Sequence, residues 1–431
     1  MKKEVVDKKN ELIKQIRYVS NLFDQKKFQE SFDLSYSLNR EYPKNINILN
    51  CLALSSIELE NLNMAKQSYI EILDLDVKQE FSHIFSNAGN LFFDTGDINK
   101  SIEFHKKAID LDNKNLTSLR GLGLASENSG NSQKAIEYYK KGLEIDRDND
   151  LINFHLANVY RVQERFDEAI QHYELSNTHL SKTNQLECIY RSNNKKLFNE
   201  KLKSFIGNSK IEPLVAALSS HASVRFDQND EYSFCKNPFD YVCTANLYDD
   251  KRFTDEFILK FIEEINQSKI SKKTQSLLKN GFQSSGNLFL NNSPNIKIME
   301  SIVMDGVNSF RHKFSDKDCG IIKNWPKNFT VIGWIIIMKK GGNLLAHMHK
   351  HGWVSGSIYL NIPKKISKNE GNIQFSYHGS DYPHDNKAYP NKMVDINKGN
   401  MVLFPSSLFH STIPFSSEEE RITLAFDVIP A

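Results

Sequence analysis

The sequence predicts an α+β chain of several domains, with an all-α solenoid in its N-terminal half and a jelly-roll β domain in its C-terminal half. Two observations carry this prediction. Residues 12–183 repeat a pattern every 34 residues, whereas short β-type segments follow one another after residue 328. A chain of 431 residues also has room for two or three domains of roughly 100–200 residues each.

The composition is that of an ordinary folded protein, with 39% hydrophobic and 25% charged residues. The 55 Lys and Arg nearly balance the 53 Asp and Glu, which argues against nucleic acid as the main partner. No apolar run reaches the roughly 18 residues of a membrane span, and no apolar signal core follows the basic start. Five widely spaced cysteines without a C-x-x-C motif predict reduced thiols and a cytoplasmic location.

The repeats are clearest in three consecutive copies that start at residues 82, 116 and 150, and two weaker copies precede them. Small residues recur at the eighth position of four copies, namely Ala53, Gly89, Gly123 and Ala157. Small residues let two helices approach closely, so each copy is expected to be a helix pair. Gly96 and Gly130 stand where the first helix of a copy must end.

This pattern resembles the tetratricopeptide repeat. The resemblance implies about five repeats in a right-handed superhelix whose concave face binds a protein or peptide, although a solenoid used only as a scaffold stays open. Segment 184–206 is expected to be the capping helix that such a stack needs. We therefore expect a solenoid at 1–206, a linker at 207–235 and a second domain at 236–431.

The second domain begins with two helical segments, 254–266 and 296–314, in which apolar residues lie three and four positions apart. From residue 328 onward the chain shows short runs rich in Ile, Val, Phe and Tyr, bounded by Gly, Pro, Asn and Ser. The runs are FTVIGWIIIM, SGSIYLNIP, GNIQFSYH, NMVLFP and RITLAFDVI. Many short strands without helices between them indicate a β-sandwich or jelly roll.

The residues suited to chemistry lie on these predicted strands. His347 and His349 are two positions apart, so a strand would point both imidazoles to one face. His410 follows 61 residues after His349 at the end of an apolar run, and Arg421 follows eleven residues later. Three histidines on one face of an octahedron suit Fe(II) and leave three positions open. An arginine near them can hold a carboxylate through two hydrogen bonds.

The stretches HMHKHGWVSGSIYLNIP and LFPSSLFHSTIPFSSEEERITLAFDV resemble the 2-oxoglutarate- and Fe(II)-dependent oxygenases. The resemblance implies that His347, His349 and His410 bind Fe(II), and that Arg421 binds the distal carboxylate of 2-oxoglutarate. Tyr359 and Thr423 would hydrogen-bond this cosubstrate. With dioxygen such an enzyme hydroxylates a C–H bond. A neighbouring peptide-binding solenoid suggests a protein or peptide as its substrate.

One position departs from most oxygenases of this superfamily, because residue 349 is His where they have Asp or Glu. A three-His site also occurs in cupins, which share the double-stranded β-helix fold. Two alternatives therefore stay open: a cupin-like metal dioxygenase that needs no 2-oxoglutarate, and a catalytically silent protein-binding scaffold. The direction in which Arg421 points, and whether the three histidines meet, would separate these readings.

Overall fold

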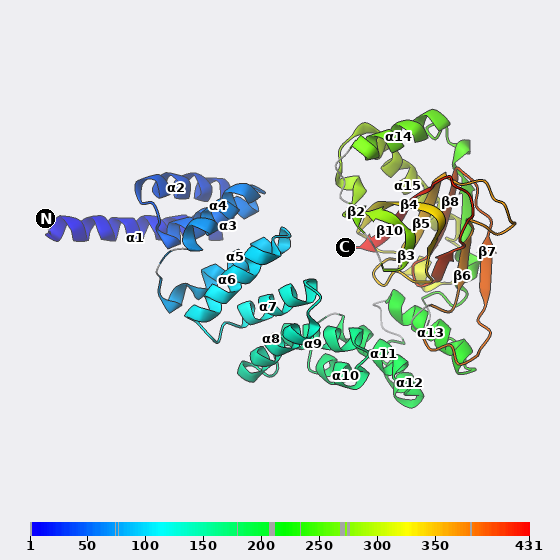
Figure 1. Ribbon diagram of the computed structural model, residues 1–431, viewed down its shortest axis with the longest axis horizontal. Helices are drawn as coiled ribbons and strands as arrows, with labels where there is room; N and C mark the ends of the chain where they lie inside the picture. Colours follow the sequence, from blue (N-terminus) through cyan, green and yellow to red (C-terminus); the bar gives the residue numbers. More distant parts are fainter. Residues whose placement is uncertain are drawn as a thin grey trace. The chain divides into compact units, whose positions relative to one another are not determined.

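The computed structural model describes residues 2–431 except 74, 76, 179, 207–211, 233, 268–271, 274–275 and 380–381. The chain forms two compact units, Met1–Gln185 (unit 1) and Leu186–Ala431 (unit 2), both drawn in Figure 1. This division differs from the linker expected at 207–235, because helices that follow residue 186 pack with the β domain. Residues 207–211 and 233 of the expected linker lie outside the described residues.

Unit 1 is all-helical, and consecutive helices joined by short turns pack against each other in pairs. Polar residues start these helices, since the side chains of Asp97, Asn115, Asn131 and Asn149 each accept a hydrogen bond from a backbone N–H of the first turn. The helices are α1 (Lys2–Asp24), α2 (Phe28–Glu41), α3 (Ile46–Glu58), α4 (Leu62–Leu73), α5 (Ser82–Asp94), α6 (Ile98–Leu111), α7 (Leu116–Asn128), α8 (Ser132–Ile145), α9 (Asp150–Val162) and α10 (Phe166–Glu174). A short 3-10 turn precedes α5, and α11 (Ser181–Arg191) crosses the division between the units.

The small residues of the repeat are required for close helix packing, as the sequence predicts. A Cβ atom added at Gly89 would lie 2.6 Å from the ring of His105, and one at Gly123 would lie 2.2 Å from the ring of Tyr139. Gly96 adopts a positive φ of 83° two residues after the end of α5, which is the predicted role of a glycine that ends a helix.

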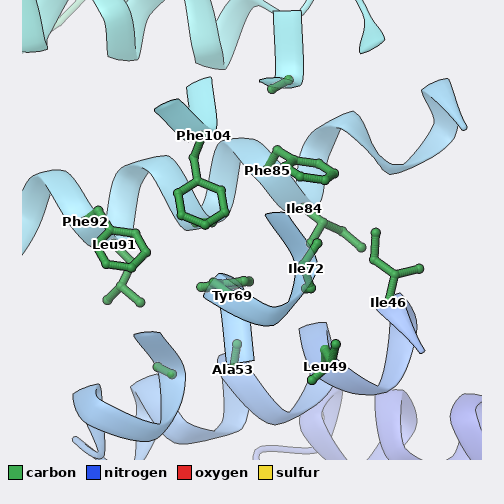
Figure 2. Close-up of a cluster of buried hydrophobic side chains, with 13 residues drawn as sticks. Ile46, Leu49, Ala53, Tyr69, Ile72, Ile84, Phe85, Leu91, Phe92 and Phe104 are labelled. Carbon is green, nitrogen blue, oxygen red and sulfur yellow. The ribbon is translucent and has the colours of Figure 1, made fainter. Parts of the chain in front are cut away.

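A continuous apolar core runs from one repeat into the next. Figure 2 shows side chains of α3, α4, α5 and α6 packed together, among them Tyr69, Phe92 and Phe104. The rings of Phe92 and Phe104 stack with their centroids 5.2 Å apart, and both residues are almost fully buried. Such stacking of neighbours stabilises helix pairs that could not bury their apolar faces alone.

Unit 2 combines helices with two antiparallel sheets. Its helices are α12 (Lys195–Lys203), α13 (Pro213–Arg225), α14 (Asp255–Gln267), α15 (Pro294–Lys313) and α16 (Gly320–Lys323). Its strands are β1 (Cys243–Asn246), β2 (Lys272–Lys273), β3 (Leu278–Ser284), β4 (Phe329–Leu344), β5 (Val354–Asn361), β6 (Ile373–Ser376), β7 (Asn391–Val394), β8 (Asn400–Pro405), β9 (Phe409–Thr412) and β10 (Arg421–Pro430). Among the described residues no helix is long and apolar enough to span a membrane.

The strands of unit 2 form a seven-stranded sheet in the order β1-β8-β5-β10-β4-β3-β2 and a three-stranded sheet in the order β7-β6-β9. The chain passes from β8 in the large sheet to β9 in the small sheet and returns to β10 in the large one. The central strand β10 pairs with β4 on one side and β5 on the other, so its residues lie in the middle of the unit.

The predicted helices 254–266 and 296–314 and all five predicted strands are present, as α14, α15, β4, β5, β6, β8 and β10. The sequence does not predict β1, β2, β3, β7 and β9. β1 and β7 consist of four residues each, and none of these residues is fully buried, so their sequences lack the apolar runs that indicate a strand.

Candidate metal centre

Three histidines from distant parts of the sequence converge in unit 2, and we call His347, His349 and His410 the convergent histidines. One ring nitrogen of each lies within 4.8 Å of those of the other two, a spacing that no further group of three His, Cys, Asp or Glu meets among the described residues. The Nε2 atoms of His347 and His349 are 3.2 Å apart. Two nitrogens bound at right angles to one ion, each at about 2.1 Å, would be about 3.0 Å apart, so the spacing fits a single metal.

Backbone pairing places these histidines. β4 ends at Leu344, so the prediction that His347 and His349 lie on a strand is wrong. Instead, the backbones of His347 and His410 exchange two N–H···O bonds of 3.1 and 2.9 Å, and the His349 N–H donates to the Ser406 carbonyl at 3.0 Å. The loop therefore runs beside the segment that holds His410, and its two histidines still reach a common point.

Hydrogen bonds orient two of the rings. His347 Nδ1 lies 2.8 Å from the Leu345 carbonyl oxygen, and His410 Nδ1 lies 3.3 Å from the Leu408 carbonyl oxygen. A carbonyl oxygen can only accept a hydrogen bond, so Nδ1 carries the proton in both rings. The lone pair of each Nε2 is then free for a metal ion, which is the arrangement of metal-binding histidines.

Asp427 orients the third ring, and the sequence analysis missed this residue. Its Oδ1 accepts hydrogen bonds from His349 Nδ1 and from Ser355 Oγ, both at 2.6 Å. The register of β10 and β5 places Asp427 directly opposite Ser355. The signal in the sequence was the alternation along β10, since Arg421 and Asp427 are six residues apart and both line the same cavity.

Burial and neighbouring charges set the protonation of the rings. Burial, followed by the adjacent His349, lowers the pKa of His347 to about 4. Burial and the other two rings hold the pKa of His410 well below its usual range. Burial alone would lower the pKa of His349, but the Asp427 carboxylate outweighs it and raises that pKa. His347 and His410 are thus neutral at pH 7, the state that binds metals.

The convergent histidines open into a cavity of about 320 Å³, which Arg421, Tyr359 and Thr423 also line. All three are at most 3% exposed. The guanidinium of Arg421 lies 5.2 Å from the centre of the Tyr359 ring, and burial lowers the Arg421 pKa. This volume is within the range of small-molecule sites.

The polar atoms of this cavity suit an anion. Arg421 Nε, the Tyr359 hydroxyl and Thr423 Oγ1 have no hydrogen-bond partner among the described residues. A buried polar atom without a partner costs about 1–3 kcal/mol, so two such hydroxyls beside a guanidinium whose own Nε lacks a partner indicate a missing acceptor. A carboxylate has the charge and the geometry to fill this place. The structure thus brings together all six residues that the sequence analysis selected.

Comparison with known families agrees with both parts of the chain. The family model described as "Putative 2OG-Fe(II) oxygenase" matches residues 333–427, and the tetratricopeptide repeat model matches residues 82–115 and 121–149. The chain joins tetratricopeptide repeats to a 2OG-Fe(II) oxygenase domain. His347, His349 and Tyr359 lie in the first part of the range that the oxygenase model matches. The other site residues, His410, Arg421, Thr423 and Asp427, lie in its last part.

Solved structures resemble part of the chain at low identity. A structure of MamA is 20% identical and covers 36% of this chain and 91% of its own, with a TM-score of 0.34. The pilF protein of Pseudomonas aeruginosa is 14% identical, with coverages of 44% and 88% and a TM-score of 0.39. A tetratricopeptide repeat protein of Parabacteroides merdae is 14% identical, with coverages of 51% and 88% and a TM-score of 0.40. No curated protein matches the chain.

Proposed function

We propose that the protein is an Fe(II)- and 2-oxoglutarate-dependent dioxygenase that hydroxylates a protein or peptide recruited by its repeats. One observation carries the proposal. A single cavity holds the three convergent histidines together with a buried guanidinium whose Nε has no hydrogen-bond partner. The match of the surrounding strands to an oxygenase family supports it.

Each residue has a part in this proposal. His347, His349 and His410 would hold Fe(II) through their Nε2 atoms, which the bonds at Nδ1 leave free. Arg421 would bind the distal carboxylate of 2-oxoglutarate, and Tyr359 and Thr423 would donate hydrogen bonds to the cosubstrate. Iron with 2-oxoglutarate and dioxygen would supply the oxidant, and the residues that line the cavity would hold and orient these groups.

The fold belongs to the same proposal. Strands that alternate between the large and the small sheet, as β8, β9 and β10 do, would form the double-stranded β-helix expected from the sequence. The repeats would bring a peptide to the enzyme, because tetratricopeptide solenoids present extended binding surfaces.

A cupin-like dioxygenase without 2-oxoglutarate and a silent scaffold are the alternatives. The cupin-like dioxygenase would not need an arginine in the cavity. The silent scaffold would not need three histidine rings whose Nε2 atoms are available to a metal ion. The position of Arg421 in the same cavity as the histidines therefore favours a carboxylate cosubstrate.

The test is an anaerobic titration of the metal-free full chain with Fe(II), with and without 2-oxoglutarate, that follows the weak visible charge-transfer band of the complex. The band is expected in the parent and absent in His349→Ala. Arg421→Ala should weaken 2-oxoglutarate binding about 10- to 100-fold, as the loss of charge-assisted hydrogen bonds implies. Arg252→Ala is the control, because that guanidinium is exposed and pairs with Asp250 and Asp305.

Other outcomes would contradict the proposal. Fe(II) binding without any response to 2-oxoglutarate would favour the cupin-like alternative, and no Fe(II) binding would leave the scaffold. Where the band forms, peptides incubated with the protein, dioxygen and 2-oxoglutarate should gain the mass of one oxygen atom, and the Arg421→Ala variant should fail to add it.

A further inference from the structure

We propose that Asp427 is a positioning residue of the metal centre. Its carboxylate fixes the His349 ring with Nε2 toward the other two ligands, and it supplies through that ring the negative charge that a ligating carboxylate supplies elsewhere. The inference rests on the proposed function only in that the convergent histidines bind a divalent metal.

The hydrogen bonds at Asp427 fix both the tautomer and the direction of the His349 ring. One oxygen, Oδ1, accepts from His349 Nδ1 and from Ser355 Oγ at 2.6 Å each. Because a carboxylate only accepts, the proton of the imidazole stays on Nδ1 and Nε2 is left as the metal-binding atom. Ser355 Oγ also lies 3.1 Å from His349 Nδ1, so the carboxylate and the serine hold the same edge of the ring.

The carboxylate is itself held in place. Ser355 Oγ bonds Asp427 Oδ1 and also lies 2.7 Å from Ser406 Oγ, while the Ser406 carbonyl accepts the backbone N–H of His349. The two serines are at most 1% exposed. Gly352 closes the group, since a Cβ there would lie 2.5 Å from Ser406 Oγ and 3.4 Å from the Asp427 carboxyl carbon. One network therefore fixes the ring and the backbone of the same ligand.

The three histidines differ in charge from the usual ligands of this kind of metal site. Non-haem Fe(II) oxygenases commonly bind their metal with two histidines and one carboxylate. Three imidazoles bound to a metal ion would bring no charge to it, whereas a carboxylate one hydrogen bond behind His349 would place one negative charge near the ion. Partners of this kind typically contribute 10- to 100-fold to metal affinity.

A purely structural role of Asp427 would give a different result when the residue is replaced. If the carboxylate only ties β10 to β5, its replacement would lower the stability of the metal-free protein and leave the metal affinity of the folded protein unchanged. If it positions the ligand, Asn in its place keeps the shape and an acceptor oxygen but removes the charge, so metal binding falls while the metal-free fold persists.

The experiment uses Co(II), whose absorption reports ligand geometry, on the metal-free full chain. For Asp427→Asn we expect a 10- to 100-fold loss of Co(II) affinity and a shifted spectrum, with the unfolding midpoint of the metal-free protein unchanged. Asp395→Asn is the matched control, because that carboxylate is exposed and pairs with Lys365. Ser355→Ala keeps the charge and removes one bond to it, so its loss should be about 2- to 10-fold.

The outcomes separate this inference from the proposed function. A folded Asp427→Asn variant that binds Co(II) within 2-fold of the parent, with the same spectrum, overturns the inference alone. A parent that binds Co(II) without any response to 2-oxoglutarate overturns the proposed cosubstrate and leaves Asp427 to be judged by the variant. A parent that binds no Co(II) overturns both. Should Asp427→Asn not fold, an unchanged affinity in Ser355→Ala overturns the inference.

Discussion

Unit 2 contains a second group of three histidines, and it differs from the convergent group in what its ring nitrogens contact. These anchor histidines are His221 on α13 and His378 and His384 in the loop between β6 and β7. His221 is fully buried, its Nδ1 is hydrogen-bonded to the Tyr190 hydroxyl, and its Nε2 is 2.9 Å from His378 Nδ1. The rings of His378 and His384 have centroids 4.9 Å apart.

The comparison shows that proximity alone does not make a metal site. In the convergent group each Nδ1 has an oxygen acceptor outside the group, and the Nε2 atoms of His347 and His349 face each other at 3.2 Å, whereas both nitrogens of His221 contact Tyr190 and His378. A ring with both nitrogens bonded to the protein has no lone pair to give to a metal. The anchor histidines therefore hold the loop between β6 and β7 against α13 instead of binding an ion.

The largest expected effect is a loss of metal affinity when one of the convergent histidines is removed. Removing one of three ligands should cost more than removing an outer partner, so His410→Ala should lose more than about 100-fold in Co(II) affinity. His378→Ala is the matched control and should stay within 2-fold of the parent. Titration of both metal-free variants with Co(II) checks this. Equal losses in the two variants would show that both groups serve one ion.

A smaller effect concerns the arginine beside the anchor histidines. Arg225 has a side chain that is 1% exposed, and it donates to Asp385 at 2.5 Å, to Asn193 Oδ1 at 2.7 Å and to the Tyr190 carbonyl at 3.3 Å. Asp385 is 44% exposed at its side chain and can be solvated when left alone. Arg225→Ala should therefore lower the free energy of unfolding by about 2–3 kcal/mol, from lost charged hydrogen bonds.

Tryptophan fluorescence can measure this loss in unit 2 alone. All three tryptophans of the chain belong to that unit, namely Trp325, Trp334 and Trp353. Denaturant unfolding of Arg225→Ala is compared with that of Arg252→Ala, whose exposed ion pairs are worth about 1 kcal/mol or less. Co(II) affinity should stay within 2-fold in Arg225→Ala, and a loss like that of His410→Ala would contradict the independence of the two groups.

The sequence predicts much of the fold because the signals are periodic or dense. The 34-residue repeat fixes small residues such as Gly89 and Gly123 at contacts where a Cβ would clash. The strands β4, β5, β8 and β10 are apolar runs in the interior of the large sheet. β1 escapes prediction because three of its four residues are exposed, so its place depends on pairing with β8 rather than on its own composition.

The residues of the candidate site also differ in how well the sequence predicts them. The residues His347, His349, His410 and Arg421 can be found from residue type and spacing. Asp427 is harder to find. The alternation along β10 puts it on the face of Arg421, but only the register, which places it opposite Ser355, shows that it faces the site and not the solvent. Residues that act directly on a ligand carry a chemical signature, whereas residues that orient them depend on pairing between distant segments.

The smallest expected effect is a pH dependence carried by His221. Burial, then His378, Arg225 and His384, lower the pKa of this ring to about 3, and the side chains of Tyr190, Tyr382 and Tyr389 also pack against it. In the unfolded chain the pKa returns to about 6.5, so between these values the unfolded state binds one more proton than the folded state. The stabilisation is complete above pH 6.5 and is lost as the pH falls, by about 1.4 kcal/mol per pH unit.

His221→Gln removes this proton while keeping a polar side chain. In the metal-free protein, unfolding followed by tryptophan fluorescence at pH values from 6.5 to 5 should therefore show a slope that is on average about 1 kcal/mol per pH unit shallower than in the parent. His312→Gln, at an exposed position of α15, should keep the parent slope. The other lowered histidines contribute equally to both proteins, so the difference isolates His221. An unchanged slope in His221→Gln would mean that this ring is protonated in the folded state, and it would then no longer be the neutral anchor that distinguishes its group from the convergent histidines.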